Sequence, residues 1–180
     1  MSDIVTEIEK LHVLRGAEFS RQVNSIASRP EFHLIEGEES IYAVGDYKSD
    51  DYVNLIVTAR KAVEHGYRVY ILPNPHGLRS ADYIFEYKQI RILYELKTIQ
   101  GRGSAGTRLL QSIGQSNRVI LNIASDYNAR LLASDIKKYF EANSEAIEVL
   151  VFKGNKKISV TRRFCINPKF NRLFRKQYEQ

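Results

Sequence analysis

Three charged residues lie near the two ends of a stretch rich in apolar and aromatic residues, residues 83–100, which reads YIFEYKQIRILYELKTIQ. Asp82 stands directly before the stretch, and Glu95 and Lys97 stand near its end, one residue apart. Two carboxylates can hold a hard divalent cation or transfer protons, and an ammonium stabilises the negative charge on a phosphate. These residue types together are suited to cleavage of a phosphodiester bond.

A β-hairpin over residues 83–99 would bring the three charges together. Residues two apart in a strand share a face, so Glu95 and Lys97 point the same way and Leu96 points to the core on the other side. With a turn over residues 87–90, Asp82 pairs with Glu95 across the hairpin. We therefore expect Asp82, Glu95 and Lys97 on one face of a sheet. The alternative is an ion pair on a solvated edge, worth roughly 0.2–1 kcal/mol.

The rest of the chain predicts an α/β (α+β) fold, in which helices flank a mixed β-sheet. From residue 51 the order is helix, strand, hairpin, helix, strand, helix and hairpin. The helix over residues 52–63 follows an i, i+3, i+4 spacing of apolar residues, and residues 118–123, RVILNI, are typical of a buried strand. We divide the chain into a helical extension, a nuclease-like core and a basic tail: residues 1–50, 51–163 and 164–180.

Composition excludes several classes of protein. The one cysteine cannot form an internal disulfide, and four scattered histidines do not form a zinc site. No apolar run approaches the roughly 20 residues of a membrane span, and the N-terminus is too acidic for a signal peptide. We expect a cytoplasmic protein with no membrane partner.

The net charge of +6 is concentrated at the C-terminus. Residues 153–180 hold five Lys and four Arg against one Glu. Such a tail could follow a phosphate backbone, and its aromatic residues could either stack on bases or pack on the body of the protein. The predicted nucleic-acid-binding residues are Arg163, Lys169, Arg172, Arg175 and Lys176, together with Arg102 in the glycine-rich loop over residues 101–107.

Two stretches carry a family resemblance: residues 79–123, from RSADYIF through YELKTIQGRGSAG to RVILNI, and residues 149–163, VLVFKGNKKISVTRR. Over roughly residues 50–165 the chain resembles the tRNA-cleaving C-terminal toxin domains of contact-dependent growth inhibition (CdiA-like) proteins and related polymorphic toxins. The resemblance implies a free-standing relative, from a mobile element, that cleaves RNA, first of all tRNA, and has an immunity protein as a partner. The site residues it implies are Asp82, Glu95, Lys97, Gln115, Thr161 and Arg162.

Two mechanisms remain open within this resemblance. Asp82 with Glu95-x-Lys97, in the element order from residue 51 to 123, also resembles the PD-(D/E)xK nucleases, in which Asp82 and Glu95 would hold Mg²⁺ and the substrate is DNA. Glu64 is a weak candidate for a further acidic ligand. The closing Thr161-Arg162 instead resembles the metal-independent barnase/EndoU/colicin/RelE-like RNases, and we favour that interpretation because the metal core does not require this hairpin.

Other readings of the chain stay open beside these. A nucleic-acid-binding module without catalysis is the third hypothesis. His76 is a lesser candidate for a role at the site. Gln111 is another, because it lies four residues before Gln115 and we expect the two to share one face of a helix.

Overall fold

The computed structural model describes residues 3–45, 51–74, 79–101 and 104–180. The chain divides into two compact units, Met1–Tyr94 and Glu95–Gln180. Strand β5, Ile90–Ile99, contributes to both units, because residues 90–94 pair with β4 and residues 95–99 pair with β6. Each unit is described in turn.

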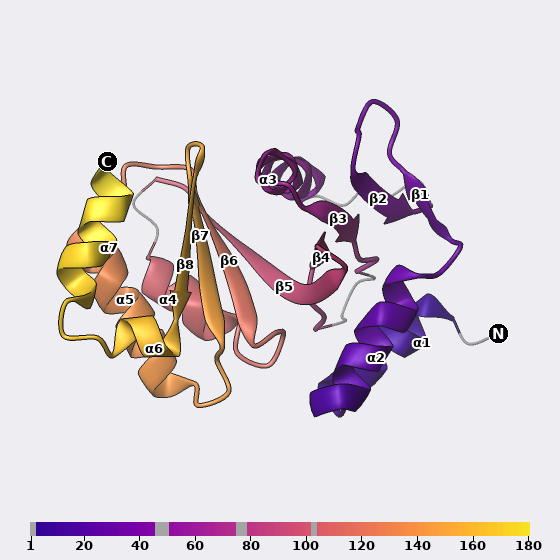
Figure 1. Cartoon of the computed structure of the whole chain (residues 1–180), viewed down its shortest axis with the longest axis horizontal. Helices are drawn as coiled ribbons and strands as arrows, with labels where there is room; N and C mark the ends of the chain where they lie inside the picture. The colour runs from indigo at the N-terminus through magenta and orange to yellow at the C-terminus, as the bar shows by residue number, and fades with distance from the viewer. Residues whose placement is uncertain (1–2, 46–50, 75–78, 102–103) are drawn as a thin grey trace. The chain divides into compact units, whose positions relative to one another are not determined.

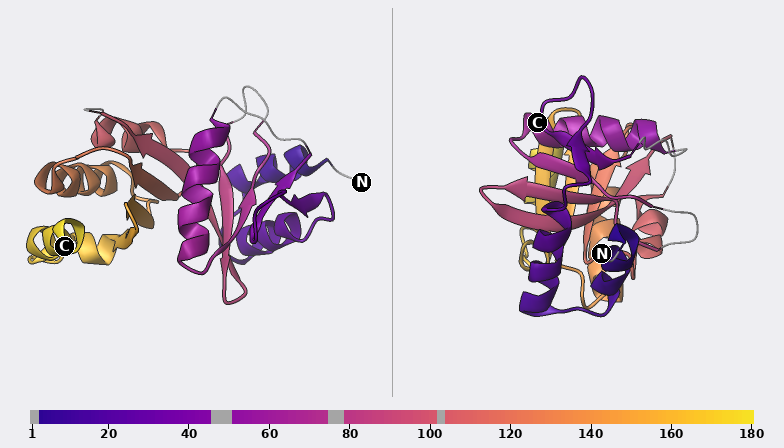
Figure 2. Two further views of the ribbon diagram at one scale, coloured as in Figure 1. Left: turned by 90° about the horizontal axis from the view of Figure 1, so that it is seen from above. Right: turned by 90° about the vertical axis from the view of Figure 1, so that its right-hand side faces the viewer.

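The first unit is a mixed sheet with helices on both faces (Figures 1 and 2). Its strands hydrogen-bond in the order β1-β2-β3-β4-β5, antiparallel except for the parallel pair β2 and β3. Helices α1 and α2 cover one face and α3 covers the other. In chain order its elements are α1 Ile4–Glu9, the 3-10 helix η1 Lys10–His12, α2 Gly16–Ala27, β1 Phe32–Leu34, β2 Ile41–Val44, α3 Tyr52–Glu64, β3 Arg68–Ile71 and β4 Tyr83–Tyr87.

Apolar periodicity explains how these helices attach to the sheet. Helix α2 buries Val23 and Ile26, one helical turn apart, in a cluster with Ile84 and Leu93 of the β4–β5 hairpin. Such a stripe removes one side of a helix from water, and the hydrophobic effect then holds it to the sheet. The sequence also predicts one or two helices within residues 3–28 and a short extended piece at residues 41–44, and the structure has α1, α2 and β2 there.

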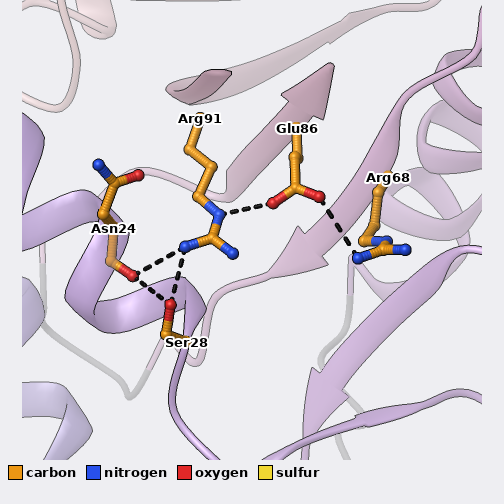
Figure 3. A network of polar contacts seen from close by, with 5 residues as sticks. All are labelled: Asn24, Ser28, Arg68, Glu86 and Arg91. Carbon is orange, nitrogen blue, oxygen red and sulfur yellow. Dashed lines mark hydrogen bonds and ion pairs between the residues drawn. The ribbon is translucent and has the colours of Figure 1, made fainter. Parts of the chain in front are cut away.

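A polar network joins α2 to the same face of the sheet (Figure 3). Arg91 on β5 donates from Nε to Glu86 at 2.6 Å, and from Nη1 to the Asn24 carbonyl at 3.1 Å and the Ser28 hydroxyl at 2.8 Å. Arg68 on β3 forms an ion pair with the other Glu86 oxygen at 3.4 Å. Because Asn24 and Ser28 lie at the C-terminal end of α2, the Arg91 cation also meets the negative end of the helix dipole.

The second unit is a sheet with its helices on one face (Figures 1 and 2). Its strands lie in the order β5-β6-β7-β8, where β5, β6 and β7 are parallel and β8 returns antiparallel. One apolar cluster joins α4, α5 and α7 to the strands. Its further elements are α4 Ala105–Gln111, β6 Arg118–Ile123, α5 Ala129–Ala142, β7 Glu148–Lys153, β8 Lys156–Thr161, α6 Arg162–Cys165 and α7 Phe170–Glu179.

The predicted fold class and element order from residue 51 are confirmed. The predicted hairpin register is also confirmed, since Glu86 pairs with Arg91 and Tyr83 with Tyr94. The division between Tyr94 and Glu95 is a feature that we did not expect, and the domain boundaries drawn at residues 50/51 and 163/164 stay predictions. In the part of the chain that the structure describes, no helix is both long and apolar enough to span a membrane.

Candidate active site

Three polar side chains of the second unit form a hydrogen-bonded set, which we call the Glu95–Lys97–Gln115 set. The Lys97 Nζ atom lies 2.5 Å from Glu95 Oε1 and 3.1 Å from Gln115 Oε1. The Glu95 side chain is 3% exposed and that of Lys97 is 17% exposed. A carboxylate, an ammonium and an amide therefore meet in a place largely removed from water.

The parallel register of β5 and β6 explains this burial. Glu95 pairs with Val119 and Lys97 with Leu121, so each shares a face of the sheet with its partner. Val119 and Leu121 belong to the apolar cluster beneath α4 and α5. The predicted alternative of an ion pair on a solvated edge is therefore wrong, because the face that carries Glu95 and Lys97 is the helix-covered face. Leu96 is buried as well, as predicted.

Gln115 reaches the set from a turn and not from a helix. Helix α4 ends at Gln111, and Gly114 then adopts φ +89°, a left-handed conformation that glycine accepts readily. The Gln115 amide donates to the Ser112 carbonyl at 3.0 Å, which fixes the turn. The expectation that Gln111 and Gln115 share one helical face is therefore wrong, and Gln111 is exposed.

A buried network fixes the start of α4. Ser104 caps the helix by accepting from the Thr107 amide, and the Ala105 amide donates to the Tyr127 hydroxyl at 3.0 Å. That hydroxyl donates to Asp135 on α5 at 2.8 Å. Burial is the main cause of the raised pKa of Tyr127, so the hydroxyl keeps its proton and the bond to Asp135. The network holds α4, and with it the turn of Gln115, against α5.

Helices α4 and α5 approach so closely that a side chain at one position between them would collide with its neighbour. A Cβ atom placed on Gly106 would lie 2.9 Å from Asp135 Oδ1 and 3.2 Å from its Cγ. Since the Tyr127 hydroxyl holds the Asp135 carboxylate, it cannot move aside freely.

The side chains of the set have complementary chemical capacities. The Lys97 ammonium can stabilise negative charge on a phosphate, and the Glu95 carboxylate can accept a proton or bind a hard cation. The Gln115 oxygen accepts from Lys97, and the NH₂ group of the same amide can donate to an acceptor such as a phosphate oxygen. This combination is suited to phosphoryl chemistry.

Asp82 lies in the first unit, at the point where β4 begins. Its amide donates to the Tyr94 carbonyl at 3.0 Å, and its carbonyl accepts from the Leu72 amide at 2.9 Å. These two bonds extend the pairing of β4 with β5 and β3 by one residue. The half-buried Asp82 thus has the backbone position that the sequence predicts, and its participation in one site with Glu95 and Lys97 stays a prediction.

Thr161 and Arg162 are engaged elsewhere in the second unit. The exposed Thr161 caps α6 and accepts from the Phe164 amide at 3.3 Å. The Arg162 guanidinium donates to the carbonyls of Phe140 and Asn143, at 2.8 and 2.6 Å, at the C-terminal end of α5. It also donates to a third carbonyl, that of residue 146, at 3.2 Å.

The register separates both residues from the candidate site. Glu95 is level with Val119, Val149 and Val160 across β5 to β8. Three strand spacings of 4.7–4.9 Å place β8 about 14 Å from β5. The structure does not bring Thr161 or Arg162 to the Glu95–Lys97–Gln115 set, and their predicted catalytic role stays a prediction.

The basic residues of the tail lie on its outer side. Of the predicted nucleic-acid-binding residues, Arg175 is half-buried and the other described ones are exposed, namely Arg163, Lys169, Arg172 and Lys176. The expectation that aromatic residues of the tail could stack on bases is wrong for Phe170, Phe174 and Tyr178, which are 0–3% exposed and belong to the core. Arg102 and His76 lie outside the described residues, and Glu64 is exposed at the end of α3.

Sequence reasoning missed two features of this unit. The link from Tyr127 to Asp135 joins residues eight apart, and nothing in their local pattern marks them as partners. Arg130, in the first turn of α5, lines a hollow with residues of α7. Arg130 is some forty positions before α7 in the sequence. Its proximity to the basic residues of α7 cannot be predicted from the sequence, because α5 and α7 meet only in the folded chain.

Comparison with known proteins finds a similar solved structure but no matching family. No family model and no curated protein matches the chain. Among solved structures, the chain is similar to a chain of a CdiA-CT/CdiI toxin and immunity complex from Burkholderia pseudomallei, with a TM-score of 0.44 and 14% sequence identity. The match covers 66% of this chain and 92% of that chain. At this level of similarity no activity or residue role follows from it.

Proposed function

We propose that the chain is a nuclease that cleaves a phosphodiester bond of RNA at the Glu95–Lys97–Gln115 set. The observation that carries the proposal is the burial of Glu95 in contact with Lys97, which in turn binds Gln115. A buried ion pair gains little net stability, because desolvation of the two charges offsets their attraction. Catalysis is a better account of such a pair than stability is.

Each residue has a defined role in this proposal. Lys97 stabilises the charge that builds on the phosphate in the transition state, and Gln115 donates to a phosphate oxygen and orients the ammonium. Glu95 takes up or delivers the proton. Asp82 is included on the strength of the sequence prediction, as a second carboxylate. Thr161 and Arg162 remain the sequence-based candidates for a mechanism without metal.

RNA, with tRNA as the first substrate to test, is proposed from the sequence resemblance to CdiA-like toxin domains. The same resemblance supports an immunity protein as a partner that would bind and inhibit the chain. Concentration of positive charge at the C-terminus supports a nucleic acid as the substrate. The cytoplasm, where tRNA is found, is the corresponding location.

A DNA nuclease that depends on a divalent metal is the second candidate. The observation that favours it is the order of elements: α3, then the antiparallel strands β3, β4 and β5, then α4 and the parallel strand β6. This order resembles that of the PD-(D/E)xK nucleases. Asp82 and Glu95 offer the oxygen ligands that Mg²⁺ prefers, and the ion would neutralise charge on the phosphate. In the part of the chain that the structure describes, no group of three or more metal-binding side chains occurs.

One experiment tests both candidates. Purified protein is incubated with tRNA, total RNA and plasmid DNA, each with EDTA or with Mg²⁺. We expect cleavage of tRNA that survives EDTA and is lost in Lys97→Met. Lys138→Met, a change at an exposed lysine on α5, is the matched control and should cleave like the wild type.

Each other outcome decides against part of the proposal. Cleavage that EDTA abolishes and Mg²⁺ restores, with Asp82→Asn as inactive as Lys97→Met, establishes the metal-dependent candidate. Cleavage that Lys97→Met retains refutes the site. Binding of RNA without any cleavage supports the third hypothesis, a nucleic-acid-binding module.

A further inference from the structure

A basic hollow of about 560 Å³ lies between the first turn of α5 and the outer side of α7. Four cations and one carboxylate line it, and the Arg175 Nε atom is 3.4 Å from Glu179. One of the four positive charges is thus partly neutralised and three remain. The lining residues are Arg130, Asn171, Arg172, Arg175, Lys176 and Glu179.

The helix that carries most of these cations is firmly anchored. Phe170 and Phe174 are fully buried in the core of the second unit, and the Tyr178 hydroxyl donates to the Tyr127 carbonyl at 2.8 Å. Lys156 on β8 donates to the Tyr178 carbonyl at 3.0 Å. Because α7 is fixed at several points, its cations lose little backbone freedom when they bind a ligand.

We infer that this hollow binds the phosphate backbone of the RNA substrate, as a site separate from the one that cleaves it. The inference rests on the proposed function. A guanidinium can bind a phosphate through two parallel hydrogen bonds, and three arginines around one hollow offer this geometry repeatedly. Asn171 supplies a further donor.

The register places the hollow away from the Glu95–Lys97–Gln115 set. Glu95 is level with Val149, at the start of β7, whereas Lys153 at the end of β7 donates to the Tyr178 hydroxyl at 3.2 Å. Four residues of strand separate these levels by about 13 Å. Helix α5 likewise begins after the C-terminal end of β6. An RNA several nucleotides long could therefore contact both places, whereas a dinucleotide could not.

Anionic lipid is the less favoured occupant. A helix that lies on a membrane needs an apolar face to insert, and the apolar face of α7 is buried in the core. The outer side of α7 offers charge and hydrogen-bond donors, which suit a hydrated polyanion.

Binding of fluorescein-labelled tRNA to the inactive Lys97→Met protein tests the inference. Fluorescence anisotropy gives the Kd between 50 and 200 mM KCl. Arg130→Glu in this background should weaken binding and reduce the slope of log Kd against log salt concentration by about 0.9 for each lost contact to duplex phosphate. Lys138→Glu makes the same charge change on α5 outside the hollow and should leave the slope nearly unchanged. Equal slopes for the Arg130 and Lys138 variants overturn the inference.

Kinetics of the otherwise wild-type enzyme separate this inference from the proposed function. Arg130→Gln should raise KM for tRNA without changing kcat. It should not change the rate at which a dinucleotide is cleaved. If wild-type protein cleaves tRNA but Arg130→Gln changes neither KM nor the slope, the inference fails alone. If nothing is cleaved but the slope depends on Arg130, the proposed nuclease fails and the phosphate site stands. Arg130-dependent binding to phosphatidylglycerol vesicles without binding to tRNA overturns the inference.

Discussion

Replacement of Lys97 should affect stability as well as catalysis, and the two effects can be separated. Lys97→Met keeps most of the aliphatic chain and removes the cation 2.5 Å from a carboxylate that is 3% exposed. Removal of one partner from a buried ion pair typically costs 3–5 kcal/mol. Because the Lys97 side chain is 17% exposed, we expect a loss at the lower end of this range, about 3 kcal/mol of unfolding free energy.

The double variant Glu95→Gln/Lys97→Met should recover most of this stability. It replaces both charges by neutral groups of similar volume, and such replacements are often neutral or stabilising. We expect its unfolding free energy to lie within about 1 kcal/mol of the wild type. The double variant should therefore be about 2 kcal/mol more stable than Lys97→Met alone.

Urea denaturation monitored by circular dichroism measures the effect. With an m-value of about 2 kcal/mol/M, a loss of 3 kcal/mol lowers the midpoint by about 1.5 M. Both variants should be inactive on tRNA, so a stable but inactive double variant assigns the chemistry to the pair and not to folding. A cost below about 0.5 kcal/mol for Lys97→Met would show that the pair is effectively solvated, and the argument from burial would be refuted.

Three further predictions concern the second unit. Gly106→Ala should lower the unfolding free energy by about 1–3 kcal/mol, because the new Cβ collides with the Asp135 carboxylate. The control is Thr107→Ala, a change at the exposed neighbouring residue, which should not lower it. Urea denaturation of the two variants measures the difference. Burial raises the pKa of the Cys165 thiol, so iodoacetamide should modify it slowly in the folded protein and rapidly in urea, as mass spectrometry would show. Burial also raises the pKa of Tyr178 from 10.0 to about 12. The stability that the neutral hydroxyl contributes is therefore complete below pH 10 and is lost as the pH rises towards 12. Between pH 9 and pH 12 the Tm should fall less steeply for Tyr178→Phe than for the wild type.

Local patterns predicted the elements that position the candidate site. Alternation of side chains and a turn over residues 87–90 predicted the β4–β5 register, which the structure confirms. The spacing of apolar residues over 52–63 predicted α3 within one residue at its C-terminal end. These features depend on residues close in sequence, and so the sequence alone is sufficient to find them.

Features that depend on tertiary packing were not predicted. Glu95 and Lys97 were expected on the face of the sheet opposite the core, and they lie beneath α4 and α5 because β6 joins β5 in parallel and brings its helical layer with it. The turn that carries Gln115 depends on Gly114, whose left-handed conformation ends the helical path. Neither the layer nor the turn follows from residue types at a given spacing.

The Thr161-Arg162 pair shows how one motif can satisfy two different tasks. In the sequence, a hydroxyl next to a guanidinium at the end of a strand resembles part of a metal-free RNase site. In the structure, the hydroxyl caps α6 and the guanidinium binds carbonyls at the end of α5, which have no partner within that helix. A capped helix end already accounts for both residues, and it lies about 14 Å from β5. The metal-free role of this pair therefore stays a prediction, whereas Glu95 and Lys97, which both mechanisms require, contact each other in the structure.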